Sequence, residues 1–211
     1  MSLRNHPWPV LLIWAFLVFE LVSSLLSQRW TVAFVALATL GLSVAPTLLA
    51  ERLNLRLPVP FVVAIVAFVF GTLFLGEVLD FYNRYWWWDV ALHGASAVTF
   101  GMVGFLFVFY LFEGDRYAAP PWAMALIAFC FAVTIGAIWE IFEYTMDQTF
   151  GTNMQKSGLQ DTMWDLIVDV IGGAVGASAG WLYLGGHREG TPARVIDQFV
   201  RMNRRLFRKA R

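Results

Sequence analysis

The chain has 211 residues, of which 59% are hydrophobic and only 14% are Asp, Glu, Lys or Arg. A soluble domain of this length carries about 25% charged residues, so the composition indicates an integral membrane protein and excludes an ordinary soluble enzyme. The 15 basic and 15 acidic residues balance, and we expect no nucleic-acid partner.

Apolar runs follow one another along the chain. A membrane-spanning helix needs about 20 apolar residues, because a rise of about 1.5 Å per residue must cover a hydrocarbon core of about 30 Å. The sequence therefore predicts an all-α protein, a six-span transmembrane helix bundle in one domain of residues 1–184, with a basic cytoplasmic tail of residues 185–211. The predicted spans are 8–26, 30–50, 59–81, 87–112, 121–145 and 163–184.

The basic residues predict the orientation of these spans, because cytoplasmic loops are enriched in Lys and Arg. With the Arg-rich tail inside, twelve of the 15 basic residues lie on the cytoplasmic side, and Arg29, Arg84 and Lys156 lie outside. We therefore expect both the N- and the C-terminus in the cytoplasm. The tail mixes Val, Ile and Phe with its arginines, which fits either an amphipathic helix on anionic lipid or a disordered tail.

The single cysteine, Cys130, lies in the apolar run ALIAFCFAVTIG. One cysteine excludes a disulfide within the chain and a Cys-based metal site. We expect a small, buried side chain at this position.

Acidic residues gather, on this topology, at the outer ends of four spans. A carboxylate at membrane depth costs on the order of 2.5–3.5 kcal/mol even on lenient scales, so such groups must face one another, water or a cation. Few basic residues lie on that side to neutralise them. The acids are Glu77, Asp80, Asp89, Glu140, Glu143, Asp147, Asp161, Asp165 and Asp169, and His93 lies with them.

On three of these spans the acids repeat every three or four residues, so they share one helix face. The stripes are Asp89 and His93, then Glu140, Glu143 and Asp147, then Asp161, Asp165 and Asp169. Counted inward at about 1.5 Å per residue, they present side chains at matched depths, which predicts a coordination site. Asp89, Asp147 and Asp161 lie near helix ends, where an acid also occurs without a functional role.

Oxygen ligands combined with one imidazole suit a divalent ion, namely Mg²⁺, Mn²⁺, Ca²⁺ or Zn²⁺. We assign metal binding to Asp89, His93, Glu143 and Asp165. The other deep or flanking acids are assigned to catalysis as general acids or bases, and these are Glu140, Asp161 and Asp169. The sequence does not separate ligands from proton carriers, so the two roles stay interchangeable at this point.

Three motifs resemble the YjdF-type family of bacterial inner-membrane proteins, which is uncharacterised biochemically. They are Asp-x-x-x-His in DVALHGASAVTFG, Glu-x-x-Glu in AIWEIFEYTMDQ and Asp-Thr-x-x-Asp in GLQDTMWDLIVDVIGG. The resemblance covers residues 60–180 and implies a multi-pass protein of the bacterial inner membrane with a site at Asp89, His93, Glu140, Glu143, Asp161, Thr162 and Asp165. A looser resemblance reaches the VanZ-like proteins, linked to glycopeptide tolerance, although the Arg expected before the final Asp is absent here.

Three functions fit these features. The first is a metal-dependent hydrolase or transferase that acts at the outer face on a lipid or lipid-linked envelope substrate. The second is a non-catalytic subunit with a structural polar cluster, which binds lipids and a membrane-protein partner or a second copy of the chain. The third is a proton or metal-cation transporter, although the inner half of the spans offers few polar residues for a path.

Overall fold

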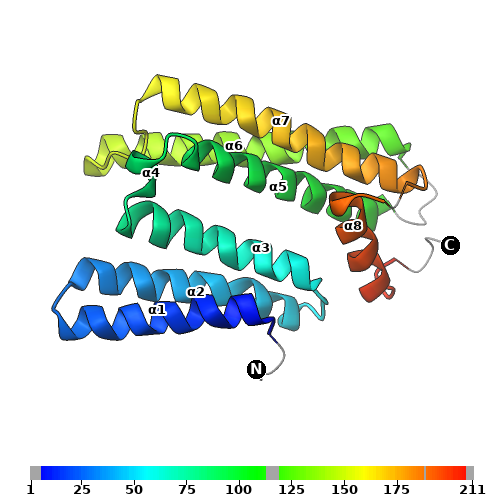
Figure 1. The fold of residues 1–211 in the computed structure, drawn as a ribbon. Coiled ribbons are helices and arrows are strands. Elements are labelled where there is room, and N and C mark those ends of the chain that lie inside the picture. The colour runs from blue at the N-terminus through cyan, green and yellow to red at the C-terminus, as the bar shows by residue number, and fades with distance from the viewer. Residues whose placement is uncertain (1–5, 113–118, 188, 208–211) are drawn as a thin grey trace. The chain divides into compact units, whose positions relative to one another are not determined.

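The computed structural model describes residues 6–112, 119–187 and 189–207. Within these ranges the chain forms helices and turns but no strand. The elements are α1 (Trp8–Leu26), α2 (Trp30–Arg52), α3 (Val59–Val69), the π-helix η2 (Phe70–Val78), α4 (Phe81–Arg84), α5 (Trp88–Phe112), α6 (Pro121–Phe150), α7 (Leu159–Leu184) and α8 (Thr191–Met202), labelled where there is room in Figure 1.

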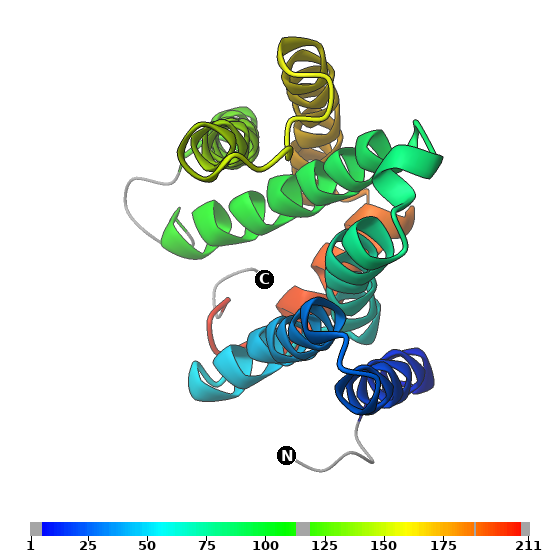
Figure 2. The same ribbon diagram turned by 90° about the vertical axis from the view of Figure 1, so that its left-hand side faces the viewer.

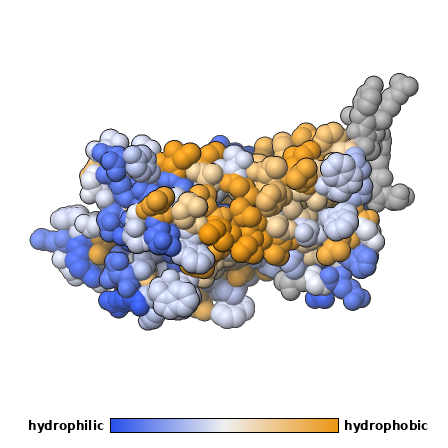
Figure 3. All heavy atoms as spheres, turned by 90° about the horizontal axis from the view of Figure 1, so that it is seen from above, coloured by the Kyte–Doolittle hydropathy of each residue, from blue (hydrophilic) through white to orange (hydrophobic). Residues whose placement is uncertain are grey.

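Among the described residues, six helical segments are long and apolar enough to cross a membrane, with α3 and η2 counted as one. The predicted all-α, six-span fold class is therefore confirmed. On the face seen in Figure 3, apolar residues occupy the middle and hydrophilic residues gather toward both ends. This distribution suits a protein whose middle lies in hydrocarbon.

The connection between α6 and α7 is shorter than predicted. α6 continues to Phe150 and α7 begins at Leu159, so both helices extend beyond the predicted spans. Gly151 and Gly158 stand at the two ends of the connection with positive φ angles, 65° and 64°. Glycine adopts this conformation without steric conflict, which explains why α6 ends and α7 begins at these two positions.

The helices fall into two compact units, Met1–Trp88 (the N-terminal unit) and Asp89–Arg211 (the C-terminal unit). Each is described by itself. The predicted single six-helix domain of residues 1–184 stays a prediction.

The N-terminal unit packs α1, α2 and the α3–η2 segment through apolar clusters around Trp14 and Phe74. Some of its buried polar groups find partners nearby, although the Ser24 hydroxyl has no hydrogen bond within the described residues. The Trp14 indole donates a hydrogen bond to the Ser43 hydroxyl at 2.9 Å, and the Thr39 hydroxyl donates one to the Val35 carbonyl oxygen at 2.7 Å. These hydroxyl and indole groups are uncharged, so their burial requires no counter-ion.

In the C-terminal unit, α5, α6 and α7 approach closely because small residues face one another. A Cβ atom added to Gly101 would lie 2.9 Å from the Gly173 carbonyl oxygen, and one added to Gly173 would lie 3.2 Å from the Ala132 Cβ. Gly176 leaves even less room, against the Val98 carbonyl oxygen. Figure 2 shows α5 crossing α6 and α7 obliquely. Small residues permit such close crossings between membrane helices.

Helix α8 covers the end of the C-terminal unit at which α5 and α7 finish. Ile196 and Val200 of α8 are buried in an apolar cluster with Phe105, Phe109 and Tyr183. Of the two expectations for the tail, the described residues match the amphipathic helix. Its apolar face, however, is covered by protein rather than open to lipid.

Several basic residues that support the predicted orientation lie outside the described residues, namely Arg4, Arg116, Arg188, Arg208, Lys209 and Arg211. The described basic residues of α8 and of the turn after it are Arg194, Arg201, Arg204 and Arg205, and all four are exposed. The placement of both termini in the cytoplasm stays a prediction.

Cys130 is exposed on α6, so the expectation of a buried side chain is wrong. Core-facing and lipid-facing positions of a membrane helix are both apolar, so the run around Cys130 does not reveal which face meets other helices.

Candidate metal centre

Five ionisable side chains meet in the C-terminal unit near the end at which α5 and α7 begin. We call them the polar cluster: Asp89 and His93 on α5, Glu140 on α6, and Asp165 and Asp169 on α7. On α5 and on α7 the two residues are four positions apart, which is about one helical turn, so both lie on the same face of the helix. All except the partly buried Asp89 have at most 8% of their surface exposed.

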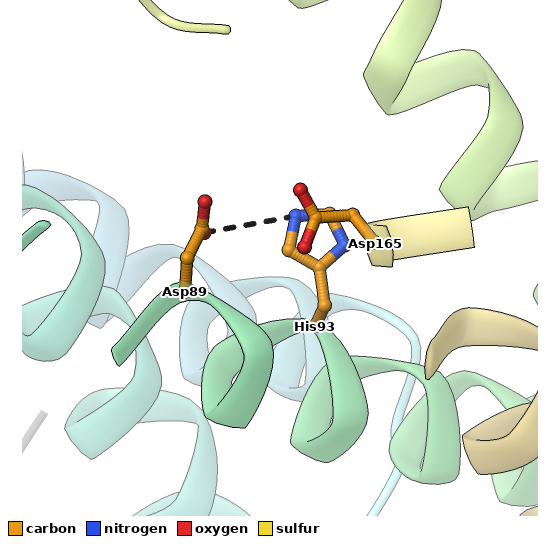
Figure 4. A group of neighbouring side chains, drawn as sticks. All are labelled: Asp89, His93 and Asp165. Atoms are coloured by element: carbon orange, nitrogen blue, oxygen red, sulfur yellow. Dashed lines mark ion pairs between the residues drawn. The ribbon is translucent and has the colours of Figure 1, made fainter. Parts of the chain in front are cut away.

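Three of these residues form a group with metal-binding geometry. One ligand atom each from Asp89, His93 and Asp165 lies within 4.8 Å of the other two. Figure 4 shows Asp89 and His93 rising from one helix while Asp165 reaches the same place from another. Two oxygens that bind one Ca²⁺ at about 2.4 Å lie at most about 5 Å apart, so this group could hold a large ion as it stands and a smaller ion after a slight contraction.

The two nitrogens of His93 face different partners. Nε2 lies 3.8 Å from Asp89 Oδ1 and 3.7 Å from Glu140 Oε1. Nδ1 lies 3.3 Å and 3.4 Å from the two carboxylate oxygens of Asp169. The ring therefore spans the polar cluster, with one nitrogen on each side.

Glu140 is buried without a conventional partner. Its side chain is 4% exposed, and neither carboxylate oxygen has a hydrogen bond within the described residues. The Thr162 hydroxyl faces this carboxylate but does not meet hydrogen-bond geometry. Oδ2 of Asp165, which is 2% exposed, is likewise without a hydrogen bond. Native proteins satisfy most buried polar atoms, so these oxygens could accept a ligand such as an ion or a water molecule.

The charge of the cluster leads to the same conclusion. Four carboxylates surround one imidazole, and burying each ion costs several kcal/mol unless it is paired. Nearby Lys156 lies within electrostatic range of Asp89 and Asp161. One imidazole and one lysine do not balance these acids. A divalent cation among the carboxylates would supply the missing positive charge.

A glycine on α6 makes room for the cluster. A Cβ atom added to Gly136 would collide with Asp169 Oδ2 and would lie 2.7 Å from its Cγ. Gly136 is one helical turn before Glu140, so both face the same side of α6. We did not identify Gly136 from the sequence, although its i, i+4 spacing to Glu140 is visible in VTIGAIWE.

Two predicted site residues lie outside the polar cluster. Glu143, predicted as a ligand, is partly buried and accepts a hydrogen bond from the Trp139 indole at 3.0 Å. Asp161, predicted to be catalytic, accepts a hydrogen bond from the Lys156 backbone N–H at 3.0 Å. Asp161 precedes Asp165 by one turn of α7.

Asp147 organises the connection between α6 and α7. Its carboxylate accepts hydrogen bonds from the Thr152 hydroxyl at 2.7 Å and from the backbone N–H groups of Met154 and Gln155 at 2.7 Å and 2.9 Å. The Gln155 side chain then donates to the Thr162 hydroxyl at 2.6 Å. Asp147 thus has a local role in holding the connection beside the polar cluster.

Comparison with known proteins places the chain in a family. Residues 8–186 match the profile of a family described as predicted membrane protein, DUF2238. The chain belongs to the DUF2238 family. This is the YjdF-type family that the three motifs resemble, so that resemblance is confirmed.

A relative from Thermotoga maritima, named only as an uncharacterized protein, is 34% identical over 100 residues. The matched stretch is 46% of this chain and 50% of that protein, so the chain spans about half the length of this relative. No solved structure matches the chain. Membership of the DUF2238 family therefore supports a multi-pass membrane protein but does not indicate a reaction.

Proposed function

We propose that this DUF2238 protein is a metal-dependent hydrolase or transferase of the bacterial inner membrane, acting from the outer face on a lipid or lipid-linked envelope substrate. The observation that carries the proposal is the group formed by Asp89, His93 and Asp165, with ligand atoms within 4.8 Å of one another. The buried carboxylate of Glu140 beside it, which accepts no hydrogen bond within the described residues, supports a reactive site rather than a purely structural one.

The roles follow from these positions. Asp89, His93 and Asp165 would hold a divalent ion, which polarises a phosphoryl or carbonyl oxygen and activates a bound water molecule. Glu140 lies 3.7 Å from His93 Nε2, where its carboxylate would accept a proton from an attacking water molecule. Glu140 would then give that proton to the leaving oxygen, as the water oxygen bonds to the substrate and the ester bond breaks. In a transferase, an acceptor hydroxyl replaces the water. Asp161 stays the predicted second acid–base group.

An enzyme fits this arrangement better than a transporter does. A transport path must cross the membrane, and charged groups mark such paths. In the described part of the C-terminal unit, the end opposite the polar cluster is filled by Phe105, Phe109, Met124 and Tyr183 together with residues of α8. This apolar packing favours a site that opens at one end only.

Metal analysis is the first test. The protein is purified, stripped with a chelator and dialysed separately against Mg²⁺, Mn²⁺, Ca²⁺ and Zn²⁺ before elemental analysis. We expect about one ion per chain in the wild type with at least one metal, and loss of that ion in Asp165→Asn. Glu143→Gln is the matched control, since Glu143 lies outside the metal group. No bound ion in the wild type, or equal occupancy in Asp165→Asn, would contradict the proposal.

Activity is the second test. Wild-type protein in nanodiscs is incubated with a total envelope-lipid extract and the bound metal, and products are followed by mass spectrometry. We expect a lipid or lipid-linked species to be consumed by the wild type and to persist with Glu140→Gln, which keeps all three proposed metal ligands. Identical lipid profiles for the wild type, this variant and a protein-free control would contradict catalysis.

The orientation needs its own test, because the proposed substrate lies at the outer face. In a Cys130→Ser background, single cysteines are placed at Asn153 in the α6–α7 connection and at Gln198 on α8, both of which are exposed. An impermeant maleimide added to intact bacterial spheroplasts should label position 153 and not position 198. The reverse pattern would place the polar cluster on the cytoplasmic side.

A further inference from the structure

Asp169 differs from the other acids of the polar cluster in what it contacts. It is 1% exposed, and both its oxygens face His93 Nδ1 at 3.3 Å and 3.4 Å. It is absent from the three-residue metal group, whereas Asp165 on the same helix belongs to it. Asp169 therefore contacts the nitrogen of the ring that faces away from Asp89 and Glu140.

This arrangement determines which nitrogen of His93 can bind a metal. A neutral imidazole carries its proton on one nitrogen and a lone pair on the other. A carboxylate only accepts hydrogen bonds, so Asp169 favours the form with the proton on Nδ1. The lone pair then lies on Nε2, beside Asp89. In known metal sites, an outer carboxylate commonly orients a ligating histidine in this way.

The backbone of α6 holds Asp169 in this position. A Cβ atom at residue 136 would occupy the space taken by the Asp169 carboxylate. Gly136 thus leaves the gap into which the carboxylate fits, with His93 of α5 on its other side. The contact joins all three helices at one point, and a displacement of Asp169 would remove the partner of His93 Nδ1.

We propose that Asp169 is a positioning residue: through a hydrogen bond from Nδ1–H it fixes the His93 tautomer that offers Nε2 to a divalent cation, and Gly136 provides the gap that holds it. This assigns to Asp169 a role in place of direct acid–base catalysis. That this tautomer serves metal binding rests on the proposed function. The tautomer itself is measurable without any metal.

The test uses nitrogen NMR of one imidazole. The chain has three histidines, so His6→Gln and His187→Gln together leave His93 as the sole signal. ¹⁵N-histidine-labelled protein in lipid bilayers, stripped of metal and held at a pH at which the ring is neutral, is compared with Asp169→Asn and Asp165→Asn. Circular dichroism and gel filtration check that each variant is folded.

We expect the proton on Nδ1 in the parent protein and in Asp165→Asn. Asp169→Asn should shift the population toward Nε2–H, and Asp169→Glu should restore it in part. Gly136→Ala keeps the carboxylate but displaces it, so it should resemble Asp169→Asn and serves as the second variant if the latter does not fold. Nε2–H in the parent, or no change in either variant, would overturn the proposal.

A Zn²⁺ titration separates this inference from the proposed function. Loss of an outer carboxylate partner weakens metal binding roughly 10–100-fold, and we expect that range for Asp169→Asn. Asp165→Asn, which removes a proposed ligand, should lose more. If the parent binds no Zn²⁺ but keeps the Nδ1–H tautomer, the metal proposal fails and the positioning role of Asp169 stands.

Discussion

The two units of the molecule bury polar groups in opposite ways. The N-terminal unit buries the hydroxyls of Ser24, Thr39 and Ser43, and those of Thr39 and Ser43 bond to carbonyl oxygens of their own helix. The C-terminal unit buries an imidazole and carboxylates whose partners lie on other helices. Hydroxyls satisfied locally need nothing from a neighbouring helix, whereas buried charges do. The proposed metal site therefore lies in the C-terminal unit.

Two helix glycines, one from each unit, differ in the same sense. A Cβ atom at Gly41 of α2 would have no neighbour within 4 Å, whereas one at Gly172 of α7 would lie 2.8 Å from the Ala97 Cβ. Close helix contact in the C-terminal unit is what allows side chains from three helices to reach one another. The four predictions below test this contrast between the units.

The largest expected effect is stabilisation by the metal. An ion at 100 times its dissociation constant stabilises the form that binds it by about 2.7 kcal/mol. We expect hydrogen exchange to slow in α5, α6 and α7 when the metal is added, and to change little in α1 and α2. A chelator should reverse this. Equal protection of both units, or protection that persists in Asp165→Asn, would contradict the placement of the site.

The next effect is steric. Gly176→Ala places a Cβ against the Val98 carbonyl oxygen, and such overpacking costs about 1–3 kcal/mol. Gly41→Ala is the matched control, because alanine in an open helical position gains up to about 1 kcal/mol. Thermal unfolding in detergent measures both changes. Equal unfolding temperatures for the two variants would show that α5 and α7 do not pack this tightly.

A smaller effect is expected in the N-terminal unit. Trp14→Phe removes the indole N–H that bonds to Ser43, and the loss of one neutral hydrogen bond costs about 1 kcal/mol. The unfolding temperature should fall, while metal affinity should stay at the wild-type value. A change in metal affinity in this variant would show that the two units are coupled.

The smallest effect is local. Asp147→Asn weakens the hydrogen bonds that order residues 152–155, without touching the helix core. We expect faster proteolysis in the α6–α7 connection and little change in global unfolding. Thr145→Val on the same helix is the control, since its hydroxyl bonds only to the Ile141 carbonyl oxygen. Equal cleavage rates in the two variants would argue against a tethering role for Asp147.

The sequence could predict the helices and most of the polar cluster, because both depend on local spacing. Apolar runs of sufficient length predict the spans, and the i, i+4 pairs Asp89–His93 and Asp165–Asp169 each occupy one helix face. These pairs meet in the structure. The use of three helices also follows from the sequence, whereas the depth of the site stays a prediction.

The sequence could not decide between acids that lie close together on one helix. Glu140 and Glu143 are three residues apart, yet Glu140 is buried against His93 while Glu143 pairs with Trp139. The choice depends on how α6 is rotated about its axis, and an evenly apolar helix carries no signal for that rotation. The exposure of Cys130 and the tethering role of Asp147 escaped prediction because they depend on tertiary contacts.

The contact between His93 and Asp169 also has a consequence for biosynthesis. The two residues are 76 positions apart in the chain, and ribosomes add about 5–20 residues per second, so about 4–15 s separate their synthesis. During that interval α5 carries an acid and an imidazole whose partners have not yet been made. Until the last two spans have been synthesised, α5 must therefore either lie in the bilayer without these partners or be inserted late.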